Sequence, residues 1–258
     1  MMNSIRSILV DYADLEFLFY EFLQNADDAG ASHIHFVIDY DSYSTKSLFN
    51  ENMKDGQGPA LMIYNNATFT DDDWSGIRKI GLGSDKVNSK VKKIGKFGKG
   101  FNICYNITDT PIVCSDTRMI HFDPMENYLH KPGLMIDHVK HRAQLASFRS
   151  QFEPFKEYFN LGTKFEGTVF RLPLRKAGSS SPPVHKRIVT PKELLDLVKS
   201  KAEDLGRSML FLPNITKLSI STKKENRKTI IMESSIKKEQ LKPNLSLYTI
   251  EYSRKKKL

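Results

Sequence analysis

The chain opens with an amphipathic helical pattern followed at once by a strand pattern, and this succession limits the folds open to it. Apolar residues in Asp14–Ala29 recur at the spacing of one helix face: Leu15, Leu18, Phe22, Ala26 and Ala29. Asp14 is placed to cap this helix, and Gly30 to end it. Residues His33–Tyr40 then alternate and are rich in β-branched and aromatic types, which predicts a strand.

Helix and strand patterns interleave along the rest of the chain. Helices are expected at residues 71–80, 101–107 and 190–205, the last with a Thr190/Glu193 capping box and a stop at Gly206. Short strands are expected at 60–64, 111–115, 119–122, 168–174, 215–221, 229–232 and 246–252. This order lacks the regular repeat of a doubly wound fold, so a mixed-sheet sandwich is expected.

Positive charge is concentrated at the C-terminal end. The 258 residues carry a net charge of +9, and residues 214–258 alone contribute 12 Lys and Arg against four Asp and Glu, a net of +8. The first 213 residues are therefore nearly neutral, at +1. A pI of about 9.3 would ordinarily suggest a nucleic-acid binder. Because the charge lies at one end, nucleic acid is not expected as the ligand of the folded body.

The sequence also limits the cellular compartment in which the protein is expected. Its apolar runs are far shorter than the roughly 20 residues of a membrane span, and its first residues form no apolar signal core. Cys104 and Cys114 alone make neither a disulfide framework nor a four-ligand zinc site, so both are expected to be reduced. We expect an intracellular, cytoplasmic protein without a membrane partner, and the nucleus stays open.

Three polar residues of the first helix share one face. Glu21, Asn25 and Asp28 are spaced i, i+4 and i+7, next to the apolar stripe. Two carboxylates and an amide oxygen are hard ligands suited to Mg²⁺, and a carboxylate there is a candidate base for activating water. A solvated acidic face fits the same spacing, so the pattern alone leaves both interpretations open.

A glycine- and lysine-rich segment is the second constellation. It contains Gly95, Lys96, Phe97, Gly98, Lys99, Gly100 and Phe101. Closely spaced glycines before a helical sequence expose backbone N–H groups that can hold phosphates, and the lysines add positive charge. Neither the Walker A pattern nor the dinucleotide fingerprint is present. A flexible surface loop is the alternative. The third constellation, Gly167-Thr168, precedes a strand and by itself indicates only a turn.

Together these segments resemble the motifs of the GHKL ATPases, which include gyrase, the ninety-kilodalton heat-shock chaperone, histidine kinases and mismatch-repair proteins. They are still more similar to the repeats of the sacsin family. The matching segments, which span about residues 5–221, are Phe22–Ala31, Gly58–Lys86, Lys93–Asn102 and Gly167–Arg175. The resemblance implies a Bergerat-type α/β (α+β) two-layer sandwich, with a mixed, mostly antiparallel sheet covered by helices on one face.

The resemblance also implies a role for each site residue. Glu21 would polarise the attacking water, Asn25 would hold Mg²⁺, and Asp28 would line the base and ribose end of an ATP pocket. The backbone of Gly95–Gly100 would hold the phosphates, and the lid would run from Ser84 to Lys93. Thr168 would support adenine recognition from the sheet.

One segment departs from the superfamily pattern. Where much of the superfamily has Asp-x-Gly-x-Gly, this chain has Tyr64-Asn65-Asn66-Ala67-Thr68-Phe69. An Asn oxygen can accept the adenine amino proton but brings no charge, and backbone approach is harder without the glycines.

The hypothesis from sequence is a chaperone-type domain that binds Mg²⁺ and ATP and hydrolyses ATP slowly. Residues 1–222 would form this domain, with a linker at about 177–187, and residues 223–258 a basic extension. Protein clients or co-chaperones are the expected partners, and a homodimer is left open. The alternatives are a protein-interaction module that has lost the nucleotide and, less favoured, a nucleic-acid binder acting through the extension.

Overall fold

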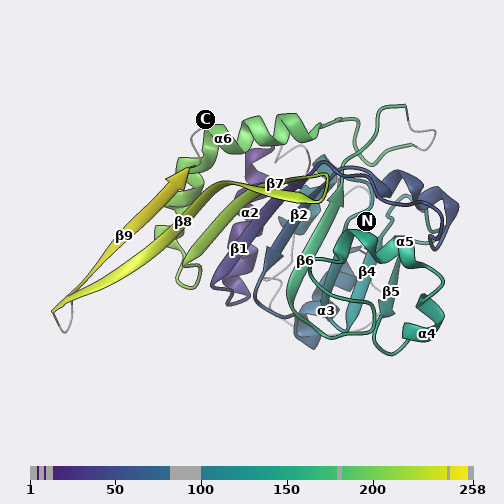
Figure 1. The fold of residues 1–258 in the computed structure, drawn as a ribbon, viewed down its shortest axis with the longest axis horizontal. Coiled ribbons are helices and arrows are strands. Elements are labelled where there is room, and N and C mark those ends of the chain that lie inside the picture. The colour runs from purple at the N-terminus through teal and green to yellow at the C-terminus, as the bar shows by residue number, and fades with distance from the viewer. Residues whose placement is uncertain are drawn as a thin grey trace.

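The structure is a computed structural model, and it describes Ile5, Leu9 and residues 14–81, 100–178, 182–242 and 245–254 (Figure 1). Its helices are α2 (Glu16–Asp28), α3 (Asp71–Gly81), α4 (Arg142–Leu145), α5 (Arg149–Phe152) and α6 (Pro191–Ser208). Its 3₁₀ helices are η1 (Glu51–Gln57), η2 (Gly100–Asn106), η3 (Glu153–Phe155) and η4 (Met209–Phe211). Its strands are β1 (His33–Asp39), β2 (Ala60–Asn65), β3 (Ile112–Asp116), β4 (Arg118–Phe122), β5 (Gly133–Asp137), β6 (Phe165–Pro173), β7 (Lys217–Lys224), β8 (Arg227–Lys242) and β9 (Leu245–Arg254).

These strands form one nine-stranded sheet in the order β5-β4-β3-β6-β2-β1-β7-β8-β9. Among the described pairs, β1 and β7 run parallel and the other pairs run antiparallel. Pro173 ends β6, a central strand, where its missing N–H costs no ladder bond. The mixed, mostly antiparallel sheet with helices confirms the α+β sandwich.

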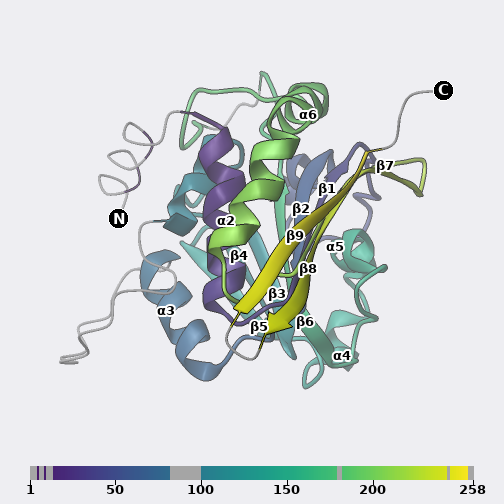
Figure 2. The ribbon, with the colours of Figure 1, turned by 90° about the vertical axis from the view of Figure 1, so that its left-hand side faces the viewer.

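The main core lies between the sheet and α2, α3, η2 and α6, which cover one face (Figure 2). The predicted stripe on α2 supplies Leu18, Phe22 and Ala26, each no more than 2% exposed. Phe22 packs edge-on against Phe170 of β6, with ring centroids 5.0 Å apart. Trp74 and Ile77 of α3 are buried in the same cluster, as their spacing predicts. This core therefore sets α2 directly over the centre of the sheet.

The opposite face is also partly covered, which extends the expected two-layer picture. The short helices α4, α5 and η3 pack on β2, β3 and β6 around a second apolar cluster that includes Met62, Phe155 and Val169 (Figure 2). Successive side chains of a strand point to opposite faces of the sheet. Central strands that carry apolar side chains on both faces must therefore be packed against other elements on both faces. Helices on one face alone would have left these side chains in water.

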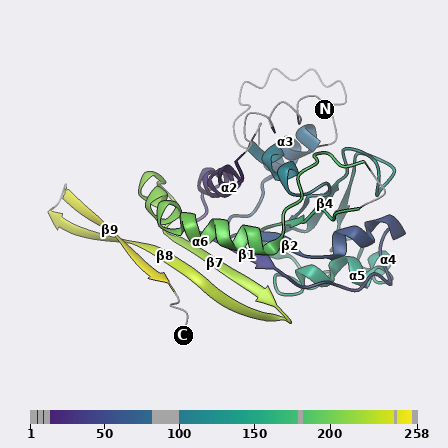
Figure 3. The same ribbon diagram turned by 90° about the horizontal axis from the view of Figure 1, so that it is seen from above.

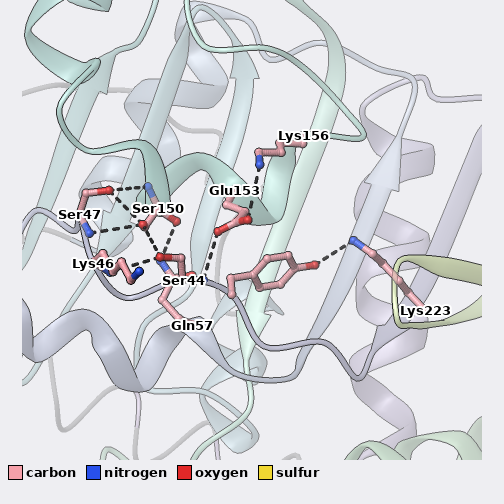
Figure 4. A network of polar contacts seen from close by, with 9 residues as sticks. Ser44, Lys46, Ser47, Gln57, Ser150, Glu153, Lys156 and Lys223 are labelled. Carbon is pink, nitrogen blue, oxygen red and sulfur yellow. Dashed lines mark hydrogen bonds and ion pairs between the residues drawn. The ribbon is translucent and has the colours of Figure 1, made fainter.

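The polar segment at 42–59 lies against α5 and contains η1 (Figure 4). Ser47 and Ser150 exchange hydrogen bonds, with their hydroxyl oxygens 2.9 Å apart, and Gln57 donates to the Ser150 carbonyl at 2.9 Å (Figure 4). The Ser44 N–H donates to the Glu153 carboxylate at 3.1 Å. Serine hydroxyls thus take the place of secondary-structure hydrogen bonds in fixing this segment.

The last three strands are longer than the short strands predicted for them. β8 has 16 residues and β9 has 10, and the hairpin that they form projects beyond the body of the domain (Figures 1 and 3). The full length of such strands is hard to predict from sequence, because the hydrophobic periodicity is weak where neither face of the strand is wholly apolar. Residues 227–242 and 245–254, most of the expected basic extension, thus form the end of the same sheet.

Several element ends differ from prediction. The N-cap of α2 is Leu15 rather than Asp14, without a side-chain cap bond. Residues 100–106 form a 3₁₀ helix, and α6 continues past Gly206 to Ser208. Gly206 faces β8 so closely that a Cβ there would lie 2.9 Å from the Ser234 hydroxyl, so it serves close packing and does not end the helix. The described residues contain no helix long and apolar enough to cross a membrane.

Candidate functional site

The polar face of α2 forms the first wall of the candidate site. Glu21 and Asn25 are half-buried at the edge of the core, and Asp28 is exposed at the end of the helix. Within the described residues, no hydrogen bond or ion pair engages these three side chains. They are therefore free to contact a ligand, as their predicted roles require.

The neighbouring carboxylate, Asp27, is buried and has a structural role. Its Oδ1 accepts hydrogen bonds from the N–H groups of Asn214 and Ile215, at 2.7 and 2.9 Å. The Asn214 amide donates back to the Asp27 carbonyl at 3.0 Å. Asp27 thereby ties the end of α2 to the segment that enters β7, and it holds the polar face of the helix at a fixed height over the sheet.

The structure brings Glu21 into contact with the end of the glycine motif. A Cβ at Gly100 would lie 3.1 Å from Cδ of Glu21 and closer still to Oε2, so glycine lets this carboxylate lie directly against the backbone. Burial raises the pKa of Glu21 above its ordinary value. A carboxyl group with a raised pKa beside exposed backbone is a sound candidate for general-base work near neutral pH. The first two predicted motifs thus meet here.

The glycine motif continues into η2, which is anchored on both sides. Phe101 is 1% exposed and packs against Phe122 and Phe170, with ring centroids 5.4 and 6.2 Å away. From the other side, the Arg175 guanidinium donates to the carbonyls of Tyr105 at 2.9 Å and Thr108 at 3.1 Å. Among the described side chains, Asn102 keeps a buried Oδ1 without a hydrogen-bond partner.

Arg175 is itself buried and paired with Asp109, with Nη2 2.9 Å from Oδ1. In the sequence, Arg175 ends a matching segment and has no predicted role. The sequence offers little indication of a buried role for Arg175, because arginine is usually exposed and most of its partners here are backbone carbonyls, which a sequence pattern does not reveal. By bonding the carbonyls of Tyr105 and Thr108, Arg175 fixes the C-terminal end of η2, the element that begins with Gly100 and Phe101.

Thr168 lies at the centre of a second small network, near the start of β6. It is fully buried, and its hydroxyl lies 2.8 Å from the Ala67 carbonyl and 2.9 Å from the Ser115 hydroxyl. Ser115 also donates to the Gly167 carbonyl at 2.7 Å and accepts from the Phe69 N–H at 2.9 Å. These bonds hold residues 67–69 against β6, so the Gly-Thr motif shapes the altered second motif.

Gly167 is required by its backbone and by its neighbours. Its φ of +127° is one that L side chains rarely adopt, and a Cβ would lie 2.8 Å from the Asn65 carbonyl oxygen. Asn65 and Thr168 are paired residues of β2 and β6. The resemblance implies that both serve adenine recognition, and the structure places them side by side.

The two asparagines of the altered motif are already engaged. Oδ1 of Asn65 accepts from the Ala67 N–H at 3.0 Å. Oδ1 of Asn66 accepts from the N–H groups of Ser32 and His33, each at 3.0 Å. Asn66 thus fastens the start of β1 to the end of β2, while Asn65 is buried next to Thr168.

The other predicted site residues fall outside the described part of the chain. Ser84, Gly95, Lys96, Phe97, Gly98 and Lys99 lie there, as does the rest of the expected lid. Within the described residues, no three or more His, Cys, Asp or Glu side chains are placed to hold a metal ion.

The remaining candidates have structural surroundings. His33 and His35, two positions apart, share a face of β1, and their ring nitrogens lie 3.3 Å from the Ser219 hydroxyl and 2.8 Å from the Ser221 hydroxyl. Burial lowers the pKa of His35 to about 4, so it is neutral near pH 7. Cys104 and Cys114 are free thiols in the core, and burial raises the pKa of each.

Comparison with known proteins gives this chain a family. The family model of the sacsin domain matches residues 1–235. Human sacsin is 33% identical over 229 residues, which are 85% of this chain and 5% of that protein. A crystal structure of the N-terminal domain of a DNA repair protein aligns over 89% of this chain and 55% of its own, with 13% identity and a TM-score of 0.42, too low to inform function. The family match covers most of the chain, and the chain therefore belongs to the sacsin domain family.

Proposed function

We propose that this domain binds ATP with Mg²⁺ and hydrolyses it slowly, in a chaperone or co-chaperone setting. The observation that carries the proposal is the contact between Glu21 and Gly100, which joins the acidic face of α2 to the end of the glycine motif. A single site thereby combines a carboxylate whose pKa burial raises with backbone from the motif expected to hold phosphates. Membership of the sacsin domain family supports the same function.

The residues fit this ligand by their chemistry. Half-buried Glu21 can take a proton from water, and half-buried Asn25 offers a side-chain oxygen to Mg²⁺ one helical turn away. The cation, when bound, would neutralise phosphate charge. Thr168 and Ser115 fix the backbone at the end of β2, where the base of the nucleotide would lie. The lid expected at 84–93 lies outside the described residues and stays a prediction.

The test separates binding from hydrolysis. Replacing Glu21 by Ala should leave the affinity for Mg²⁺ and ATP within a few-fold of the parent and reduce phosphate release about 10²-fold or more. Replacing Asn25 by Ala should weaken binding only when Mg²⁺ is present. Exposed Gln24 on the same helix is the matched control, and Gln24→Ala should change neither quantity. Unchanged phosphate release by Glu21→Ala would remove Glu21 as the base.

A second candidate function is a protein-interaction module without nucleotide. It is favoured by the side-chain oxygens of Asn65 and Asn66, which already accept backbone hydrogen bonds and leave less capacity for an adenine amino group. Such a module would show no heat of binding when ATP and Mg²⁺ are titrated into the protein. In it, Glu21→Ala would change nothing but the local charge.

A further inference from the structure

The outer edge of β9 is a long, open sheet edge. β9 pairs with β8 from Leu245 to Arg254 and ends the sheet order, so its other side faces outward along ten residues (Figures 1 and 3). The opposite edge strand, β5, has only five residues and starts at a glycine. Short edges resist pairing with other chains, whereas long ones act as templates for it. The two edges of this sheet therefore differ in their capacity to add a strand.

Up to its last residue, Arg254, the sequence of β9 lacks the usual protection of an edge. Residues 245–253 contain no Pro, Lys or Arg. Their one acidic residue, Glu251, is paired with Lys237 of β8. Tyr248 and Tyr252 are 53% and 40% exposed, and they share a face of β9 with Ile250 because positions two apart point the same way. Within the described residues, such a strand presents a sheet edge together with aromatic surface.

We propose that β9 pairs antiparallel with β9 of a second copy of this chain, about a two-fold axis at Ile250. In this register Ile250 faces the partner's Ile250, and Tyr248 faces the partner's Tyr252. Gly206 of α6 lies beside Tyr252, so Tyr252 is on the face of the sheet that α6 covers. Because opposed side chains of an antiparallel pair lie on one face, the two sheets would form one continuous sheet with α6 of both copies on the same side. This pairing goes beyond the proposed function and does not depend on nucleotide.

Self-complementarity is the reason to commit to a second copy. Aromatic and β-branched residues directly opposite each other are the cross-strand pairs that stabilise sheets, and this register supplies three of them from one short sequence. On the other face, exposed Thr249 meets the partner's Glu251, so no like charges oppose each other there. The Arg254 positions of the two copies lie eight residues apart along the ladder, about 27 Å. That distance exceeds the screening length, so the basic ends do not repel strongly.

Additional apolar surface lies next to this edge. η4 directly follows the last turn of α6, and its Leu210 and Phe211 are 48% and 85% exposed. A Cβ at Gly206, in that last turn, would lie 3.9 Å from the Tyr252 ring. Exposed aromatic surface at the end of α6 thus continues the exposed tyrosines of β9, and a neighbouring copy could cover both.

The main test measures association as a function of concentration by analytical ultracentrifugation. The parent chain should dimerise reversibly. Thr249→Glu places like charges opposite each other twice per dimer and should weaken association about tenfold, whereas Thr249→Lys should associate at least as well as the parent. Thr229→Glu, an equally exposed change outside the β8–β9 ladder, is the control for net charge. A parent chain that stays monomeric at every soluble concentration, or a dimer indifferent to Thr249→Glu, would overturn the proposal.

Cysteine cross-linking tests the register itself. Opposed residues of an antiparallel pair lie about 4.5–5.5 Å apart at Cα, within disulfide range. Ile250→Cys should therefore form a covalent dimer under mild oxidation, and Thr249→Cys should not, since position 249 faces the partner's Glu251. The native thiols are buried and will not compete. Equal cross-linking at both positions would contradict the two-fold axis at Ile250.

Discussion

Replacing Gly100 by Ala should displace the Glu21 carboxylate with little effect on stability. The added methyl would lie 3.1 Å from Cδ of Glu21 and nearer to Oε2, whereas ordinary contacts begin at 3.4 Å. The carboxyl group must therefore move by on the order of 1 Å, and a misplacement of that size costs about 10²-fold in rate. This equals about 2.7 kcal/mol of transition-state stabilisation. Gly100 has no positive φ, so Ala fits its backbone and adds about 0.4–1 kcal/mol of stability through the unfolded state.

Phosphate release under saturating ATP, urea unfolding and calorimetric binding would be measured on the same preparations. Gly76→Ala in α3 is the matched control, because a Cβ there meets nothing within 4 Å. It should stabilise the helix by up to about 1 kcal/mol and leave phosphate release unchanged. Adding Gly100→Ala to Glu21→Ala should have no further effect, since the displaced group is then absent.

Two results would refute this reasoning. If Gly100→Ala releases phosphate at the parent rate while Glu21→Ala does not, Glu21 acts from another position than the one beside Gly100. If Gly100→Ala slows release equally in the presence and absence of the Glu21 carboxylate, the glycine matters for the nucleotide and not for the base.

Three further predictions concern stability. Gly167→Ala should cost more than about 2 kcal/mol in the free energy of unfolding, because it adds a close contact with the Asn65 carbonyl to an unfavourable φ. Arg175→Met should cost about 3–5 kcal/mol in urea unfolding, since it leaves Asp109 buried without its cation. His35, with its folded pKa lowered to about 4 from 6.5, binds fewer protons than in the unfolded chain, so stability should fall as the pH drops below 6.5. Between pH 7 and pH 5 its share is about 2 kcal/mol, and His35→Gln should remove that share.

Each of these changes has a control. Gly178 also has a positive φ, of +75°, but open space at Cβ, so Gly178→Ala should cost less than Gly167→Ala. Arg118→Met breaks an exposed ion pair with Asp71 and should cost under about 1 kcal/mol. His141 is exposed, and His141→Gln is the matched substitution of a histidine at the surface. A variant that matches its control would show that burial or close contact is not the cause.

Much of the fold could be predicted from the sequence, because the hydrophobic periodicity of a helix or strand is a property of neighbouring residues. The stripe of Leu18, Phe22 and Ala26 predicted α2 and its buried face, and the alternation at His33–Tyr40 predicted β1. The prediction that the helix stops at Gly206 was wrong, because a glycine that ends a helix cannot be distinguished in sequence from one that allows close packing against another element. Its neighbour Ser234 lies 28 residues away, on a strand whose polar alternation concealed its length.

The sequence predicted the residues of the candidate site, but it did not predict the contacts that hold those residues in place. The resemblance to the sacsin family identified Glu21 and Gly100, but their contact joins residues far apart in the chain. Asp27 and Asp28 are adjacent and chemically identical, and only the approach of Asn214 and Ile215 decides which one is buried. Arg175 works through backbone carbonyls, which leave no trace in a sequence pattern.

The most direct test of the proposed function is a calorimetric titration of ATP into the parent chain, with and without Mg²⁺. We predict saturable binding of one nucleotide per chain in the presence of Mg²⁺, weaker binding without it, and loss of this difference in Asn25→Ala. An absence of binding heat under both conditions, in a protein that unfolds cooperatively, would contradict the proposal and leave the sheet as a scaffold for protein contacts.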